Sequence, residues 1–232
     1  MEVIFRKHWT NLNSPAKNAD PDVQWELGYY YEFGAKEKSG RVLATPNLVT
    51  AMKWYEAAAA QGNSSAQISL SRILSSPNKL ERNFPMAIQW AKKAIAQGES
   101  SAAFNLATIY RDLSKPKLAF RWYQRAGSMG DTDAFLQLGL CYFFGFGTKQ
   151  DFDAARAAFE RVANADSNTT SPRSKEDAYY WISVLCLIRG GLTKKSVAHI
   201  RSMLEIANAD SDHEQANELL NLIGKNGNLA VA

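Results

Sequence analysis

Apolar residues recur at helical spacing along most of the chain, and the recurrence itself repeats. Three segments place a tryptophan eight residues before a glycine: they are MKWYEAAAAQG, IQWAKKAIAQG and FRWYQRAGSMG, which end at Gly62, Gly98 and Gly130. A glycine after an alanine-rich helix is typical of a left-handed helix end. The pattern predicts a helix, called helix B below, that stops at each of these glycines.

A second helical pattern follows each glycine after three mostly polar residues. AQISLSRIL begins at Ala66, AAFNLATIY at Ala102 and AFLQLGLCY at Ala134. Asp, Asn, Ser and Thr just before a helix are typical N-caps, and residues four apart share one helix face. We expect this helix, called helix A, to follow helix B after a turn of about four residues. The spacing varies only between helix A and helix B of one pair, so insertions are expected there.

The repeat predicts an all-α fold, because one helix pair alone could not bury its apolar stripe whereas stacked pairs can. We expect an α-solenoid of about five antiparallel helix pairs plus a C-terminal closing helix. A long polar loop is expected over 35–47, and an exposed insertion over 165–177 before a helix A that starts at Ala178. The expected segments are an N-terminal arm of undefined shape at 1–19, pairs at 20–62, 63–98, 99–130, 131–166 and 167–210, a closing helix at 211–224 and a tail at 225–232.

These segments resemble the Sel-one-like repeat family, which is related to the tetratricopeptide repeats. AFLQLGLCYFFGFG at 134–147 is similar to the first half of the family pattern, and AMKWYEAAAAQG at 51–62 is similar to the second half. The second pair departs from the pattern, since it has Ser71 in place of the helix-A glycine. The resemblance covers about residues 20–224 and implies a protein-binding solenoid: an adaptor, a scaffold or, as in some bacterial members, an immunity protein that neutralises a toxin.

Composition and charge limit the class of protein, its location and its type of partner. Of the 232 residues, 46% are hydrophobic and 22% are charged, which is typical of a soluble globular protein. No apolar run is long enough to span a membrane, and MEVIFRKHWTNLN is unlike a signal peptide, so we expect a cytoplasmic location. The net charge is +4, but it is +5 over 85–130 and −3 over 131–232. This asymmetry favours a protein partner with an acidic patch, although a solvated outer face would carry the same charges.

Motifs for catalysis, metals or nucleotides are weak. FFGFGTK lacks the spacing of a phosphate-binding loop, and the acids of DTD at 131–133 and SDHE at 211–214 stand at helix N-caps with too few metal ligands. Cys141 and Cys186 fit buried reduced thiols better than a disulfide, although catalytic groups such as His199 and a cysteine can meet only in space. The variable period argues against a repeat code for RNA. We therefore expect no enzyme activity, no cofactor, no metal and no nucleic-acid partner.

The resemblance implies that helix A lines the concave, partner-binding face. Trp, Tyr and Arg are the residue types that anchor interfaces, although a register shift of one residue would make Trp25 and Trp181 core residues. The sharper hypothesis is an immunity protein that binds a toxin or effector; the alternatives are a general adaptor and an enzyme with an unrecognised site. Helix-A positions outside the packing register give the predicted protein-binding residues: Trp25, Glu26, Tyr29, Arg72, Asn105, Thr108, Arg111, Gln137 and Trp181.

Overall fold

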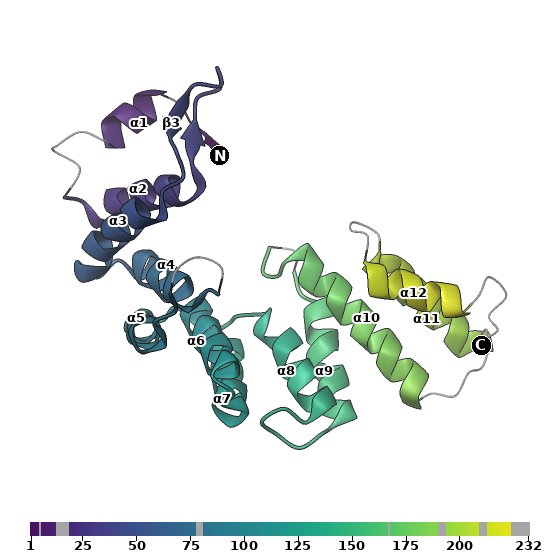
Figure 1. Ribbon diagram of the computed structural model, residues 1–232. Coiled ribbons are helices and arrows are strands. Elements are labelled where there is room, and N and C mark those ends of the chain that lie inside the picture. The colour runs from purple at the N-terminus through teal and green to yellow at the C-terminus, as the bar shows by residue number, and fades with distance from the viewer. Residues whose placement is uncertain are drawn as a thin grey trace. The chain divides into compact units, whose positions relative to one another are not determined.

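The computed structural model describes residues 1–4, 6–12, 19–77, 81–166, 168–189, 194–208 and 213–223. The chain divides into two compact units, Met1–Ile109 and Tyr110–Ala232, and each is described by itself. Helices dominate both units, and they follow one another along the chain in adjacent pairs (Figure 1). The all-α fold class predicted from the repeat is confirmed.

The first unit contains two helix pairs, which stack in chain order. Each helix packs against the next one along the chain, from α2 to α5. The turn at 61–63 ends in the N-cap residue Asn63, and in the turns at 61–63 and 97–99 Gly62 and Gly98 take φ values of +97° and +94°. A Cβ at either glycine would meet nothing within 4 Å, so the backbone conformation, not lack of space, requires glycine. The helices are α2 (Pro21–Phe33), α3 (Leu48–Ala60), α4 (Ser64–Ser75), α5 (Phe84–Ala96) and most of α6 (Ser100–Asp112).

The N-terminal arm and the segment 35–47 form regular structure that the sequence pattern did not predict. Strand β1 (Glu2–Val3) pairs in parallel with β2 (Ala35–Lys36), and β2 pairs antiparallel with β3 (Val42–Ala44). Helix α1 (Arg6–Leu12) brings Leu12 into the cluster that buries Ala35 and Ala44. The predicted polar loop is therefore wrong in part. Strands of two or three residues are too short to show the alternation by which a strand is recognised in sequence.

The second unit continues the same arrangement and ends with a closing helix that packs on α11. One boundary differs from the prediction, because α10 begins at Pro172 and not at Ala178. Proline fits the first turn of a helix, and the buried Glu176 then lies inside the helix instead of in an exposed loop. The predicted tail 225–232 and residues 211–212 lie outside the described residues. The helices are α7 (Pro116–Ser128), α8 (Ala134–Phe144), α9 (Phe152–Ala163), α10 (Pro172–Arg189), α11 (Lys194–Ala207) and α12 (Glu214–Ile223).

The helix-A glycine makes room for an aromatic ring of helix B. A Cβ on Gly139 would lie 2.3 Å from the ring of Phe159, and a Cβ on Gly28 would lie 2.6 Å from the ring of Tyr55. Both rings are almost fully buried. In the second pair the position of the ring is taken by Ala91, and Ser71 stands where the glycine would be. The departure from the family pattern thus keeps the two positions matched in size.

Side-chain amides tie helix B to helix A within each of the first two pairs. The amide of Gln61 donates to Gln24 at 2.8 Å, and the amide of Gln97 donates to Gln67 at 2.9 Å. Gln24 and Gln67 are both buried, so leaving either amide unpaired would be costly. The glutamine of each AQG sequence therefore fixes how the end of helix B packs on helix A of the same pair.

Candidate functional site

Two of the predicted binding residues on α2 are already in contact with the chain's own N-terminal arm. The carboxylate of Glu26 accepts a hydrogen bond from the Tyr30 hydroxyl at 3.0 Å, and it lies 2.5 Å from Nε2 of His8. The Tyr29 hydroxyl donates to Glu2 at 3.0 Å. A partner that reached Glu26 and Tyr29 would therefore share this face with residues of the arm.

The other helix-A candidates of the first unit, apart from Arg72, are half-buried. Trp25 packs near Tyr29, with 6.1 Å between ring centroids, and its indole nitrogen is buried without a hydrogen-bond partner among the described residues. On α6 the Thr108 hydroxyl donates to the carbonyl of Phe104 at 3.3 Å, and Asn105 lies one turn away on the same helix. Their role in binding stays a prediction.

Arg72 has a structural role that the sequence pattern did not indicate. Its guanidinium contacts both carboxylate oxygens of Glu32 at 2.7 Å, and the side chain of Glu32 is only 1% exposed. The Tyr55 hydroxyl donates to the same carboxylate at 3.0 Å, and burial together with this carboxylate raises the pKa of Tyr55. Arg72 therefore neutralises a buried charge, which is expensive to leave unpaired.

Trp181 packs among other aromatic rings of the second unit. It is stacked on Phe159 with 6.1 Å between ring centroids, and it meets Phe143 and Phe144 edge-on at 5.1 and 5.7 Å. It is half-buried against the core cluster of this unit. Most of its neighbours are thus residues of its own chain, and a role in binding remains a prediction.

Arg111 and Gln137 line a pocket between α7 and α8. Its volume is about 260 Å³, and its walls are mainly apolar. Arg111 follows directly after the start of this unit, and Gln137 lies on α8 one turn before Cys141. We call this feature the α7/α8 pocket; its lining residues are Arg111, Pro116, Ala119, Tyr123, Gln137, Leu140, Cys141, Phe144 and Phe146.

The loop after α8 holds Phe146 at the edge of this pocket. Gly145 ends the helix with a left-handed conformation, φ +73°, and the N–H of Phe146 donates to the carbonyl of Cys141 at 2.8 Å. Gly147 lies so close to the start of α7 that a Cβ there would be 2.2 Å from the carbonyl oxygen of Pro116. This close approach explains the Gly-x-Gly element. The side chains of Phe144 and Phe146 are left 53% and 62% exposed.

The sequence pattern found only the helix-A part of this pocket. Ala119 and Tyr123 come from helix B, outside the set of predicted binding residues, and both are buried in the lining of the pocket. A signal was present in the segment YFFGFG, since a helix end is normally followed by polar residues. Phenylalanines on both sides of Gly145 indicate an apolar surface at that point.

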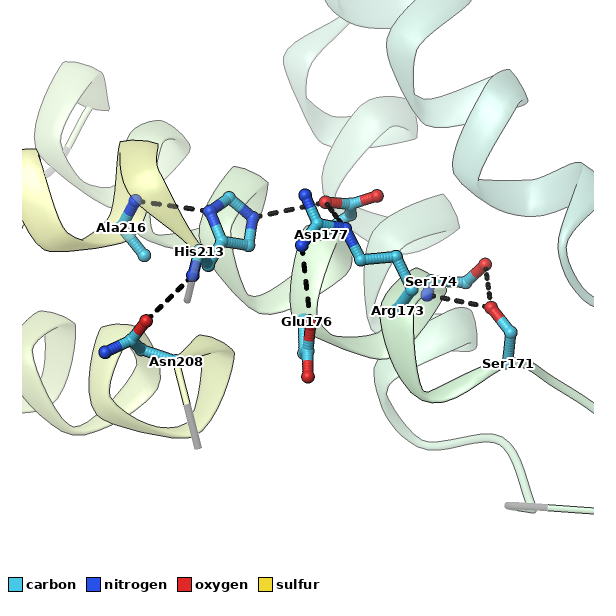
Figure 2. Close-up of polar contacts among 8 residues, drawn as sticks. All are labelled: Ser171, Arg173, Ser174, Glu176, Asp177, Asn208, His213 and Ala216. Carbon is cyan, nitrogen blue, oxygen red and sulfur yellow. Dashed lines mark hydrogen bonds and ion pairs between the residues drawn. The ribbon is translucent and has the colours of Figure 1, made fainter. Parts of the chain in front are cut away.

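A histidine and an aspartate lie together where α12 meets α10 (Figure 2). Nε2 of His213 lies 3.1 Å from Asp177, and Nδ1 accepts the backbone N–H of Ala216 at 3.3 Å. Because Nδ1 accepts a hydrogen bond, the proton of the neutral ring is on Nε2, which donates to the carboxylate. The ring is 1% exposed and both nitrogens are engaged. This arrangement caps α12 and leaves no ring nitrogen to accept a proton from a substrate.

A second pocket, of about 440 Å³, is lined by Cys186 and His199 together with an Asp153–Arg189 ion pair. Cys186 and His199 make no hydrogen bond to one another. Both cysteines are free thiols: Cys141 is buried and Cys186 is half-buried, so the expectation of two buried thiols holds for one of them. Burial raises the pKa of Cys141 to about 11, which keeps this thiol protonated and unreactive at neutral pH.

Other kinds of site find no support in the described part of the chain. No cluster of three or more His, Cys, Asp or Glu side chains among the described residues could hold a metal ion. The carboxylate of Asp131 in the DTD segment accepts the N–H of Ala134 at 3.0 Å, as expected for a helix cap. None of the described helices is both long enough and apolar enough to cross a lipid bilayer.

The repeat family follows from comparison of the sequence with family models. The model of the Sel1 repeat matches residues 21–63, 64–99, 100–131 and 133–166, which is more than half of the chain. The chain belongs to the Sel1 repeat family. This confirms the resemblance read from the repeat pattern. No curated protein sequence matches the chain.

Solved structures of other repeat proteins share the fold. The Sel1 repeat protein from Oxalobacter formigenes is 23% identical with a TM-score of 0.75, and the match covers 97% of this chain and 85% of that one. The protective antigen c5321 of uropathogenic Escherichia coli, which has an SLR fold, is 22% identical with a TM-score of 0.76. That match covers 94% of this chain but only 44% of the Escherichia coli protein.

A more distant structure is that of a tetratricopeptide repeat (TPR) protein. YrrB, described as a TPR protein with an unusual peptide-binding site, is 18% identical with a TM-score of 0.52. The match covers 92% of this chain and 98% of YrrB. At these identities the likeness is one of fold.

Proposed function

We propose that this protein is a non-enzymatic interaction module that binds a protein partner at the α7/α8 pocket. The observation that carries the proposal is the position of Phe144 and Phe146, which are largely exposed beside an apolar depression. Large exposed aromatic side chains grouped at a pocket are typical of surfaces that bind proteins. Membership of a repeat family supports the same reading, since stacked helix pairs present extended binding surfaces. The peptide-binding site of the similar protein YrrB points in the same direction.

The size of the pocket is suited to a single large side chain of a partner. Pockets for small ligands usually measure about 300–1,000 Å³, whereas a cavity of about 150 Å³ already accommodates benzene. The α7/α8 pocket, at about 260 Å³, lies between these values. One large apolar side chain from a protein would fill much of it.

Affinity capture of tagged protein from its native cells, followed by mass spectrometry, tests this function. We expect a stoichiometric partner that stays bound to wild type and is lost on Phe146→Ser. Val49→Ala is the matched control, because Val49 is 59% exposed and lies on α3, which belongs to the first unit. A partner that binds wild type and Phe146→Ser equally would contradict the proposed site. Recovery of chaperones alone would contradict the proposed function.

The narrower hypothesis of an immunity protein concerns the identity of this partner. It rests on family analogy, and a general adaptor in signalling or host interaction is the alternative. Co-expression separates the two: an immunity protein rescues cells from one toxin that it binds, whereas an adaptor binds several unrelated proteins and rescues from none. The cytoplasmic location expected from the sequence belongs to the same hypothesis, and cell fractionation tests it.

A further inference from the structure

We propose that the α7/α8 pocket receives one large apolar side chain from an acidic segment of the partner, and that Arg111 pairs with a carboxylate beside that side chain. The inference rests on the proposed function and adds the chemistry of the partner. Two independent features support it: the apolar lining of the pocket, and Arg111 in that lining together with the excess of positive charge in the adjoining segments of the chain.

The base of the pocket offers a non-polar environment. Leu140, Ala119 and the buried Cys141 contribute apolar atoms, and Phe146 stands at the edge with 62% of its surface exposed. Cys141 remains a neutral thiol at neutral pH because burial raises its pKa, so the base carries no charge. Filling such a pocket with an apolar side chain removes the surfaces of both partners from water, which is the main source of binding free energy here.

The chain segments next to the pocket-lining residues are rich in positive charge. The segments that border it, 110–117 and 144–150, contain four cations and one acid. Among the residues that the structure describes, Arg111 is the only charged one that lines the pocket itself. An acidic segment would complement this charge, and a basic one would be repelled. The cations are Arg111, Lys115, Lys117 and Lys149, and the acid is Asp112.

Arg111 is held only weakly by its own chain. Its nearest carboxylate is that of the adjacent Asp112, at 3.4 Å, and its side chain is 55% exposed. An exposed ion pair of this kind contributes little to stability. The guanidinium is close enough to Cys141 to counteract part of the burial that raises the thiol pKa, which places its charge beside the pocket. Arg111 can therefore turn from Asp112 to a carboxylate of a ligand at little cost.

Fluorescence anisotropy with synthetic peptides and the full chain tests the inference. The probe is a fluorescein-labelled peptide with a central phenylalanine flanked by glutamates. One comparison peptide replaces the glutamates with glutamines, and the other replaces the phenylalanine with serine. We expect either replacement to weaken binding about tenfold or more. Raising the salt concentration from about 0.05 M to about 0.5 M should also weaken binding of the acidic peptide.

Variants of the chain separate a direct electrostatic contact from a general effect. We expect Arg111→Gln to weaken binding of the acidic peptide about threefold to fivefold, and Asp112→Asn to strengthen it about twofold because it removes the competing carboxylate. Arg125→Gln is the control, because it also removes one positive charge. Arg125 lies on α7, where helical spacing puts it on a different face from Ala119 and Tyr123. Unchanged thermal unfolding checks that each variant is folded.

Several results would overturn the inference. They are no binding of the acidic peptide at about 1 mM, equal binding of the glutamate and glutamine peptides, or weaker binding by Asp112→Asn. Displacement of the peptide by an oligonucleotide of dT would show that the charge serves nucleic acid. If a captured partner is lost on Phe146→Ser but binds equally to Arg111→Gln and Asp112→Asn, the proposed function stands and the acidic ligand is excluded.

Discussion

At the scale of single residues, two arginines that the sequence pattern treats alike have different surroundings. Arg72 and Arg111 were both predicted to bind a partner, and both are partly exposed. Arg72 pairs with the buried carboxylate of Glu32 through two contacts of 2.7 Å, whereas Arg111 has a single contact of 3.4 Å to the adjacent Asp112. The exposed fraction of the arginine side chain does not distinguish the two residues. The burial of the carboxylate that each arginine contacts does.

We therefore expect Arg72→Ala to destabilise the fold, and Arg111→Ala to leave it nearly unchanged. Removing the partner of a buried charge should lower the free energy of unfolding by about 2–3 kcal/mol, somewhat less than for a fully buried pair because Arg72 is partly in water. For an exposed pair the change should stay within about 0.5 kcal/mol. Urea unfolding followed by circular dichroism measures both.

A second substitution in the same network checks the cause. Glu32→Gln removes the buried charge but keeps an acceptor for the Tyr55 hydroxyl, so adding it to Arg72→Ala should recover part of the lost stability. Equal losses for the single and the double variant would contradict this role of the pair. It follows that a loss of binding by Arg72→Ala is not in itself evidence of a partner contact.

Thiol labelling tests the environment of the two cysteines. Burial raises the pKa of Cys141 to about 11 from an ordinary value near 9, so its thiolate is scarce at pH 8. We expect iodoacetamide to modify Cys186 well before Cys141, compared in the single variants Cys141→Ser and Cys186→Ser. Similar rates for the two thiols in the folded protein would contradict the burial of Cys141.

The raised pKa of Cys141 also makes the stability of the folded protein depend on pH. Because the folded-state pKa lies above the unfolded one, the protonated thiol is favoured in the fold. Its contribution is complete below about pH 9 and is lost as the pH rises toward about 11. The stability of wild type should therefore fall across this range more steeply than that of Cys141→Ser, as alkaline unfolding curves would record.

At the scale of elements, the closing helix α12 depends on one buried histidine. His213 stands at its N-terminal end, where Nδ1 accepts the N–H of Ala216, Nε2 donates to Asp177 on α10, and the ring packs against Tyr180 at 5.2 Å between centroids. Its own N–H donates to Asn208 at the end of α11 at 2.9 Å. One residue thus joins three helices, as Figure 2 shows.

We expect His213→Ala to loosen α12 without unfolding the first unit. Loss of a helix cap alone costs about 1 kcal/mol, and loss of the bond to Asp177 adds to it, so amide exchange in α12 should rise about tenfold or more. His213→Asn keeps a capping acceptor and should give an intermediate rate. His199→Ala, at an exposed histidine on α11, should have no effect; equal effects at both histidines would contradict the capping role.

At the scale of the whole molecule, the sequence predicts what depends on local, repeated chemistry. The glycines at 62, 98 and 130 all take a positive φ, and Asn63 and Asp131 accept backbone N–H groups at the start of α4 and α8, so helix order and type followed from the pattern. It did not predict the β2–β3 hairpin, because the strands are short, nor the start of α10, because Ser, Pro and Asp suit both loops and helix starts.

The candidate site was predictable only in part, for a physical reason. The family resemblance, which implies that helix A faces the partner, put Arg111 and Gln137 among the predicted binding residues, each on its own helix. The rest of the pocket depends on how α7 lies against α8 and on the close approach of Gly147 to Pro116, which are contacts between different repeats. The pairing of Arg72 with Glu32 and the contact of Glu26 with His8 likewise join residues that are distant in sequence. No pattern along the chain reports such contacts.

The most direct test of the central claim is hydrogen–deuterium exchange of the protein, free and saturated with the partner obtained by capture. We predict that binding slows amide exchange most strongly in 110–150, which contains α7, α8 and the loop that carries Phe146. Protection confined to α2, α3 and α4, with exchange in 110–150 unchanged, would contradict the claim that the partner binds at the α7/α8 pocket.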